Sequence, residues 1–255
     1  MPLEILTIPC LSDNYAYAVR DNETGEVALV DVPEAAPILR ALSNEGWGLD
    51  KILITHHHYD HIDGLDLVCR SIDAPAIGAR SDIHRLPELA QSVASGDSLA
   101  LGTQAIKVFD VSGHTTGHVA YHFPSGSALF TGDSLMVMGC GRLFEGDAET
   151  MWASLSRLMQ LPPETRIYSG HEYTAQNAKF ALSIEPENRA LIDRVRRISE
   201  ARARGEDTMG PTLGLEMKTN PFLRAGLPEV KNAIGMEGAP DAEVFAEIRR
   251  RKDAF

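Results

Sequence analysis

The sequence predicts an α/β protein in which helices cover β-strands, with a helical region from about residue 172 onward. Short apolar runs separated by turn signals fill the chain up to residue 130, whereas helical periodicity dominates after residue 148. The 255 residues are 44% hydrophobic, enough to bury a large core in one domain or in two unequal ones. Strands covered by helices are typical of a layered α/β architecture.

The first half contains most of the expected strands. Short apolar runs predict strands at 3–8, 15–20, 27–32, 51–54, 74–79, 105–111, 119–123 and 128–130. The polar turn at 21–25 predicts that the strands on either side of it form a hairpin or meander. Helical spacing predicts a helix over 34–45 that stops at Gly46, and a short helix over 64–71.

The second half reads mainly as helix. Periodic apolar residues predict helices at 151–161, 174–183 and 187–204, with a single strand at 166–168. Residues 205–240 are rich in Gly and Pro, as in Gly210-Pro211 and Asn220-Pro221, and we expect this segment to be mostly loop.

Composition excludes several classes of function. The net charge is −12, and a nucleic-acid partner needs a basic stripe that this chain lacks. The three cysteines are far apart and form no CxxC pair, which favours a reducing compartment. The sequence shows no signal peptide and no apolar run of membrane-spanning length. We therefore expect a cytoplasmic protein with no membrane partner.

Histidine gives the strongest chemical signal, in the run Thr55-His56-His57-His58-Tyr59-Asp60-His61. It follows directly on the apolar run at 51–54, so a buried strand would deliver it into a loop. Imidazole nitrogens and carboxylate oxygens are ligands that zinc, iron and manganese all accept. In such a loop His56 and His58 can meet one ion while Asp60 and His61 meet a second.

Three further candidate ligands follow predicted strands: His114, Asp133 and His171. Each comes directly after a glycine, which lets the backbone turn sharply and approach a site closely. Together with the histidine run they supply enough donors for two ions that share Asp133.

With these motifs the sequence resembles the metallo-β-lactamase superfamily and, within it, the glyoxalase II or hydroxyacylglutathione hydrolase branch. The resemblance covers essentially the whole chain. Besides the metal motifs, it rests on Asp13-Asn14-Tyr15, Phe130-Thr131-Gly132-Asp133, Gly139-Cys140-Gly141-Arg142, Gly170-His171-Glu172-Tyr173-Thr174, Asn220-Pro221-Phe222-Leu223-Arg224 and residues 249–255. It implies a four-layer αββα sandwich over residues 1–171 and a helical glutathione-binding domain over 172–255.

The resemblance also implies a dinuclear metal centre. Metal one would take His56, His58 and His114, metal two would take Asp60, His61 and His171, and Asp133 would bridge them. Such ions lower the pKa of bound water from about 15.7 toward about 7, so that hydroxide can attack a thioester carbonyl. Asp60 is the catalytic candidate: it would either only ligate or also orient that hydroxide. We expect two divalent ions, zinc first, while iron or manganese suits the same donors.

Glutathione binding is implied for residues that match the family pattern: Arg142, Tyr173, Asn177, Arg249 and Lys252. Residues 189–255 carry 13 basic and 11 acidic side chains, so the tail suits the carboxylates of glutathione. Arg250 and Arg251 are expected to be solvated. The chain departs from the pattern at Phe144, which replaces a tyrosine and removes a hydroxyl from this region.

Several nearby residues are expected to support the site. Asp31, at a predicted strand end, either orients a ligand imidazole or serves a turn. His57 and Tyr59 are expected to pack around the ligands, and His118 to buttress its loop. Cys140 is expected to be a small buried residue rather than a nucleophile.

The predicted function is hydrolysis of S-2-hydroxyacylglutathione, in particular S-D-lactoylglutathione, to a 2-hydroxy acid and glutathione by a monomer. This is the second step of methylglyoxal detoxification. The alternative is a glutathione-persulfide (sulfur) dioxygenase, which uses one iron on the same fold. A β-lactamase is disfavoured because Asp133 stands where the common zinc lactamases have Cys, and a nuclease is disfavoured by the negative charge.

Overall fold

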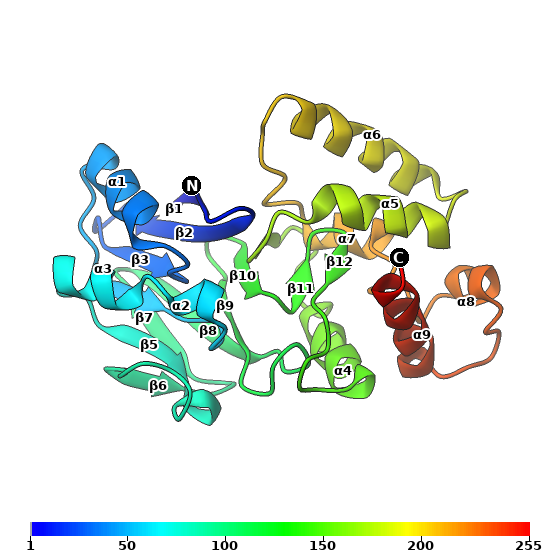
Figure 1. The fold of residues 1–255 in the computed structure, drawn as a ribbon, viewed down its shortest axis with the longest axis horizontal. Coiled ribbons are helices and arrows are strands. Elements are labelled where there is room, and N and C mark those ends of the chain that lie inside the picture. Colours follow the sequence, from blue (N-terminus) through cyan, green and yellow to red (C-terminus); the bar gives the residue numbers. More distant parts are fainter. Residues whose placement is uncertain (1) are drawn as a thin grey trace. The chain divides into compact units, whose positions relative to one another are not determined.

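The computed structural model describes residues 2–255, which form two compact units (Figure 1). Unit 1 contains the chain up to Val111 together with Thr116–Gly132, and unit 2 contains Ser112–Thr115 and Asp133–Phe255. Among the described residues, no helix is both long and apolar enough to cross a membrane.

Unit 1 contains a six-stranded sheet in the order β1-β2-β3-β4-β5-β6. Its strands are β1 (Leu3–Cys10), β2 (Asn14–Asp21), β3 (Val27–Val30), β4 (Lys51–Leu53), β5 (Ala76–Ala79) and β6 (Gln91–Val93). The first three pair antiparallel, which confirms the predicted meander, and β3 to β6 pair parallel. Strands β3 and β5 are buried along their whole length, as expected of parallel strands covered on both faces.

Helices α1 (Ala35–Glu45) and α3 (Leu65–Ser71) belong to the core of this sheet. The spacing of Ile38 and Leu42 places both side chains on the buried face of α1, where they join Leu29 and Ile52 in one apolar cluster. Helix α1 ends as predicted at Gly46, whose left-handed conformation (φ 66°) lets its N–H bond back to the last turn.

Four strands of a second sheet also lie in unit 1, in the order β10-β9-β8-β7. They are β7 (Ser98–Leu101), β8 (Gln104–Asp110), β9 (Val119–Phe123) and β10 (Ala128–Gly132), all antiparallel to their neighbours. The sequence predicted the last three. Strands β6 and β7 were not expected, because each has only three or four residues.

Unit 2 is mainly helical. It contains α4 (Ala148–Leu158), α5 (Thr174–Ile184), α6 (Arg189–Ala203), α7 (Leu213–Thr219), α8 (Pro228–Ile234) and α9 (Asp241–Asp253), with the strand β13 (Arg166–Ser169) and the hairpin of β11 (Leu135–Met136) and β12 (Gly139–Cys140). The expectation that 205–240 is mostly loop is confirmed, although the segment also contains the two short helices α7 and α8. Its Pro and Gly delimit helices rather than exclude them: Pro228 opens α8, and Gly235 ends it in the left-handed conformation.

Candidate metal centre

In unit 1, the histidine run leaves the end of β4 and leads into the short helix α2 (Tyr59–Ile62). The start of this connection is held by two side chains. The Tyr121 hydroxyl donates to the carbonyl of Ile54 at 2.8 Å. The Asp31 carboxylate accepts bonds from the backbone N–H and the hydroxyl of Thr55, each at 2.8 Å. The loop therefore starts from a fixed point in the core.

Asp31 also fixes one of the predicted ligands. His61 Nδ1 lies 2.9 Å from Asp31 Oδ2, and both side chains are buried. With Nδ1 bonded to the carboxylate, Nε2 is the nitrogen that His61 would present to an ion. Of the two roles that the sequence left open for Asp31, the structure shows the orienting one.

The other donors of unit 1 form a compact group. His56 Nδ1 lies 3.0 Å from the Thr55 hydroxyl, and His56 Nε2 lies 3.2 Å from His58 Nδ1. The Asp60 carboxylate accepts a bond from Asn14 Nδ2 at 3.1 Å. Asn14 belongs to the Asp13-Asn14-Tyr15 motif, and its amide also reaches the Asp60 backbone carbonyl at 2.9 Å.

In unit 2, Asp133 lies between the two remaining histidines. Its Oδ2 is 3.5 Å from His114 Nε2 and 3.3 Å from His171 Nε2. His114 Nδ1 bonds to the carbonyl of Arg142 at 2.8 Å, which again directs Nε2 toward the carboxylate. The glycines before His114 and Asp133 have φ of 146° and 47°, so the sharp backbone turns expected there are present.

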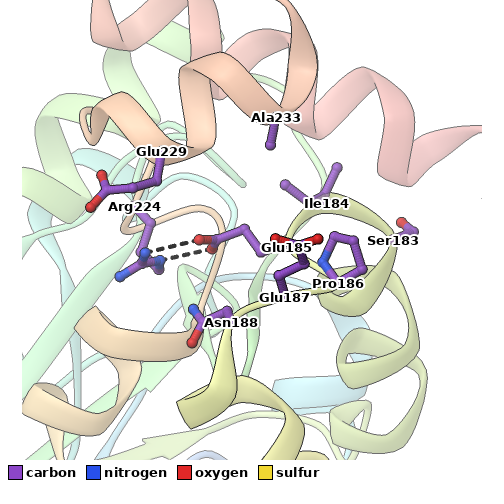
Figure 2. A pocket seen from close by; sticks show the side chains of 9 residues that line it. All are labelled: Ser183, Ile184, Glu185, Pro186, Glu187, Asn188, Arg224, Glu229 and Ala233. Carbon is purple, nitrogen blue, oxygen red and sulfur yellow. Dashed lines mark hydrogen bonds and ion pairs between the residues drawn. The ribbon is translucent and has the colours of Figure 1, made fainter.

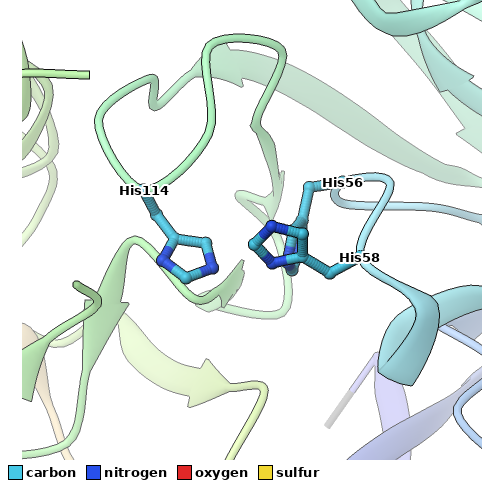
Figure 3. A group of neighbouring side chains, drawn as sticks. All are labelled: His56, His58 and His114. Atoms are coloured by element: carbon cyan, nitrogen blue, oxygen red, sulfur yellow. The ribbon is translucent and has the colours of Figure 1, made fainter. Parts of the chain in front are cut away.

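The predicted donors make up three sets of side chains that could hold a metal ion: His56, His58 and His114; His56, His61 and Asp133; Asp60, His61 and His171. Figure 3 shows the three imidazole side chains of the first set. All seven predicted ligands occur in these sets. Imidazole and carboxylate donors oriented by hydrogen bonds through their outer atoms suit zinc, iron or manganese.

The residues predicted to bind glutathione all belong to unit 2, and they differ in burial. Arg142 is exposed and Phe144 is 63% exposed, with its ring 5.2 Å from that of His114. Tyr173 is 37% exposed and stacks on His171 at 4.7 Å between ring centroids. Two aromatic rings thus pack against two candidate ligands.

Lys252 is partly buried above the rings of Phe180 and Phe255. Burial, with the neighbouring Arg249 and Arg142 guanidinium groups, lowers the pKa of its ammonium to about 8. An anion beside Lys252 would relieve that repulsion. The charges at this place are therefore suited to a carboxylate.

Arg249 and Asn177 are more deeply buried than a direct contact with glutathione would suggest. Arg249 is 5% exposed and donates to the carbonyl of Cys140 at 2.9 Å and to Asp253 at 2.8 Å. Asn177 is 6% exposed and donates to the carbonyl of Val137 at 3.1 Å. Cys140 is buried, as expected, and burial raises the pKa of its thiol to about 11.

The structure adds partners that the sequence did not identify. His57 Nδ1 lies 2.8 Å from the buried carboxylate of Asp82. His57 therefore connects the ligand loop, the segment 55–58 between β4 and α2, to the residues that follow β5. His118 stacks on His56 at 4.5 Å and so supports the ligand loop. Tyr59 is 75% exposed, and the expectation that it packs around the ligands is wrong. No local pattern could have paired His57 with Asp82, because 25 residues separate them.

This fold and donor pattern define a member of the metallo-β-lactamase superfamily, whose sequence model matches residues 12–171. A second model, the C-terminus of hydroxyacylglutathione hydrolase, matches residues 172–255. The chain is 57% identical to a hydroxyacylglutathione hydrolase of Cereibacter sphaeroides and 56% identical to one of Ruegeria pomeroyi, each over 100% of both chains. The chain therefore belongs to the hydroxyacylglutathione hydrolase family.

A solved structure supports the superfamily assignment. The BLEG-1 B3 metallo-β-lactamase is 25% identical, with a TM-score of 0.67 over 86% of this chain and 99% of that one. It lacks a counterpart for part of the present chain, whereas the hydroxyacylglutathione hydrolases match along the whole length. The family, rather than the superfamily alone, accounts for the complete sequence.

Proposed function

We propose that this protein hydrolyses S-2-hydroxyacylglutathione thioesters, S-D-lactoylglutathione in particular, at a centre of two divalent metal ions. Water adds to the thioester carbonyl and the carbon–sulfur bond breaks. The products are the 2-hydroxy acid, D-lactate for this substrate, and glutathione. The observation that carries the proposal is the position of Asp133, whose Oδ2 lies within 3.5 Å of the Nε2 atoms of both His114 and His171. The proposed reaction is the second step of methylglyoxal detoxification.

The proposed ligands are those expected from the sequence. His56, His58 and His114 would hold one ion, Asp60, His61 and His171 the other, and Asp133 would contact both. Zinc is the proposed metal, and iron or manganese suits the same donors. When bound, the ions supply a water acidic enough to serve as nucleophile near neutral pH.

Asp60 is the proposed catalytic residue. Its Oδ2 accepts the Asn14 amide, which fixes the carboxylate orientation. A carboxylate held in this way can accept the proton of a nearby water and direct the oxygen lone pair toward the substrate carbonyl. The departing thiolate has an ordinary pKa of about 8.5 and needs no strong general acid.

Arg142, Lys252 and Tyr173 are proposed to bind the glutathione portion, with Phe144 beside it. The positive charges of Lys252 and Arg142 are close enough to repel each other, and this repulsion contributes to the lowered pKa of Lys252. A carboxylate of glutathione would neutralise this repulsion. Arg249 and Asn177, predicted as further contacts, would act from the buried side of the same region.

The domain boundaries, the location in the cell and the oligomeric state are also proposals. Residues 1–171 would form the metal-binding domain and 172–255 the glutathione-binding domain, in a cytoplasmic monomer. The full-length likeness to hydroxyacylglutathione hydrolases supports this reaction over the dioxygenase alternative.

The test is to incubate the zinc-loaded protein with S-D-lactoylglutathione and to measure free thiol and D-lactate. Equal amounts of the two products are expected. A protein that consumes oxygen with glutathione persulfide, and leaves the thioester intact, would show that the dioxygenase alternative is correct.

A further inference from the structure

The hairpin formed by β11 and β12, residues 135–140, lies between two groups of the proposed site. Asp133 precedes it and Arg142 follows it. Leu135 pairs with Cys140 and Met136 with Gly139, so Val137 and Met138 form the turn. Met138 has φ of 62°, a left-handed conformation that a side chain other than Gly, Asn or Asp seldom adopts. Such a turn persists only where its surroundings hold it.

Side chains from the helices of unit 2 bond to the backbone of every residue from Met136 to Cys140. These bonds are Asn220 Nδ2 to Met136 O (3.3 Å) and Gly139 O (3.0 Å), Asn177 Nδ2 to Val137 O (3.1 Å), Met138 N–H to Glu216 Oε2 (2.9 Å) and Arg249 Nη1 to Cys140 O (2.9 Å). A two-stranded hairpin of this length has little stability by itself. The helices therefore determine where it lies.

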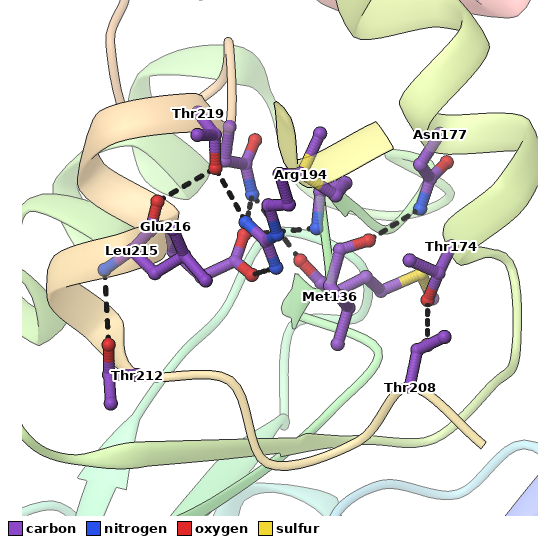
Figure 4. Close-up of polar contacts among 12 residues, drawn as sticks. Met136, Thr174, Asn177, Arg194, Thr208, Thr212, Leu215, Glu216 and Thr219 are labelled. Carbon is purple, nitrogen blue, oxygen red and sulfur yellow. Dashed lines mark hydrogen bonds and ion pairs between the residues drawn. The ribbon is translucent and has the colours of Figure 1, made fainter. Parts of the chain in front are cut away.

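Glu216 is the centre of this arrangement, and Figure 4 shows its carboxylate beside Arg194. Its carboxylate is fully buried and accepts bonds from Arg194 Nη2, from Asn220 Nδ2 at 3.1 Å and from the N–H of Met138. Arg194 also donates to the Thr219 hydroxyl at 2.6 Å. The ion pair with Arg194 thus fixes the Glu216 carboxylate, whose Oε2 accepts the bond from the Met138 N–H in the turn.

The position of the hairpin determines the positions of two proposed ligands, Asp133 and His114. Gly141 N–H donates to Ser134 O at 3.1 Å, and a side chain at Gly141 would come within 2.0 Å of the Asp133 carbonyl. The carbonyl of Arg142 accepts the bond from His114 Nδ1 at 2.8 Å. Moving the hairpin would therefore move Asp133 and release His114.

We infer that Glu216 is a positioning residue: by binding the Met138 N–H while paired with Arg194, it sets the 135–140 hairpin that orients Asp133 and His114. The inference rests on the proposed function only in taking these two residues as metal ligands.

A second buried ion pair in the same unit provides a matched control. Glu185 Oε2 and Oε1 accept bonds from Arg224 Nε (2.7 Å) and Nη2 (2.8 Å), and both side chains are largely buried. Figure 2 shows this pair in the wall of a pocket lined also by Glu187, Asn188 and Glu229. The carboxylate of Glu185 bonds to Arg224 and not to the hairpin. Replacing this pair is therefore expected to leave the turn unchanged.

The experiment compares two double variants, Arg194→Met with Glu216→Leu, and Arg224→Met with Glu185→Leu. Replacing both members of a buried pair with apolar residues is often neutral for stability, so both proteins are expected to fold. A single variant, Glu216→Gln, keeps one oxygen for the Met138 N–H. Hydrogen exchange of the Met138 amide is measured on metal-free protein, and zinc affinity is measured by competition with a chelator.

The Glu216 double variant is expected to exchange the Met138 amide at least about tenfold faster than the unmodified protein, because that N–H loses its acceptor. It should bind zinc about 10- to 100-fold more weakly, the usual effect of losing the outer partners of metal ligands. The Glu185 double variant should change neither value more than about twofold. Glu216→Gln should restore protection of the amide.

Unchanged exchange and zinc affinity in the Glu216 double variant would overturn the inference, as would equal losses in the Glu185 control. Both readouts are independent of catalysis. A protein that shows the expected exchange and zinc results but leaves S-D-lactoylglutathione intact would support the role of Glu216 and contradict the proposed function.

Discussion

Asp31 Oδ2 lies 2.9 Å from His61 Nδ1, and the same carboxylate holds both polar groups of Thr55. One side chain thus holds both the start of the histidine loop at Thr55 and the ring of His61, a proposed ligand, near its end. Asp31 itself has φ of 58°, a conformation that Asp and Asn tolerate better than most residues. The hydrogen bonds to Thr55 and His61 and the left-handed backbone at position 31 both favour a short polar side chain.

Replacing Asp31 tests this arrangement. Asp31→Ala should weaken zinc binding by about 10- to 100-fold, because His61 loses the group that fixes its ring. Asp31→Asn suits the backbone and keeps one acceptor, so its effect should be smaller. Chelator competition gives both affinities. Equal affinity for zinc in the Ala variant and the unmodified protein would show that Asp31 serves only the fold.

Asp60→Asn tests the proposed catalytic residue. The change keeps the size of the side chain and one oxygen but removes the charge that would orient the attacking water. We expect kcat to fall by at least about two powers of ten, the scale of single electrostatic groups in such sites. The assay needs saturating zinc and a measured metal content. Near-normal turnover at full metal loading would refute the assignment.

Phe144→Tyr tests the departure from the family pattern. The ring is 63% exposed beside His114, so an added hydroxyl has room to meet the substrate. One extra hydrogen bond contributes about 0.5–1.5 kcal/mol. KM for S-D-lactoylglutathione should drop a few-fold while kcat changes little. If KM stays the same, the side chain at position 144 does not face glutathione.

Lys252 gives a prediction about pH. The pKa of its ammonium is lowered to about 8, so the side chain is charged below pH 8 and neutral above it. A substrate carboxylate favours the charged form, and KM should therefore be constant below pH 8 and rise above it. Binding above pH 8 should also take up a proton.

Substitution at the same position provides the control. Lys252→Ala should raise KM by roughly tenfold, abolish this pH dependence and leave kcat within a few-fold, because the lysine is equally useful in ground and transition states. Arg250→Ala removes an exposed charge of the same helix, paired with Glu247, and should leave KM unchanged. A rise in KM for both variants would indicate a general charge effect instead.

The sequence identified the proposed donors because they occur in short local motifs. His56, His58, Asp60 and His61 follow one strand, and His114, Asp133 and His171 each follow a glycine after a further predicted strand. The strands of the first half were predicted well for a similar reason, since a run of buried residues such as Val27–Val30 is visible without its partners.

The supporting contacts were harder to predict because they join residues that are far apart in the chain. Glu216 and Met138 are 78 positions apart, and no periodicity identifies such a bond. The deep burial of Arg249 was not predicted either, since Arg249 was expected to contact glutathione and its partner Cys140 lies 109 positions away. Arg249 contacts Cys140 and Phe222, whereas its neighbour Arg250 is exposed and pairs with Glu247.

The most direct test of the central claim is to titrate zinc into metal-free protein while following hydrolysis of S-D-lactoylglutathione. We expect activity to rise until about two ions are bound per chain, and both products to appear in equal amounts. Full activity at one ion per chain, or no hydrolysis with two ions bound, would contradict the dinuclear thioester hydrolase described here.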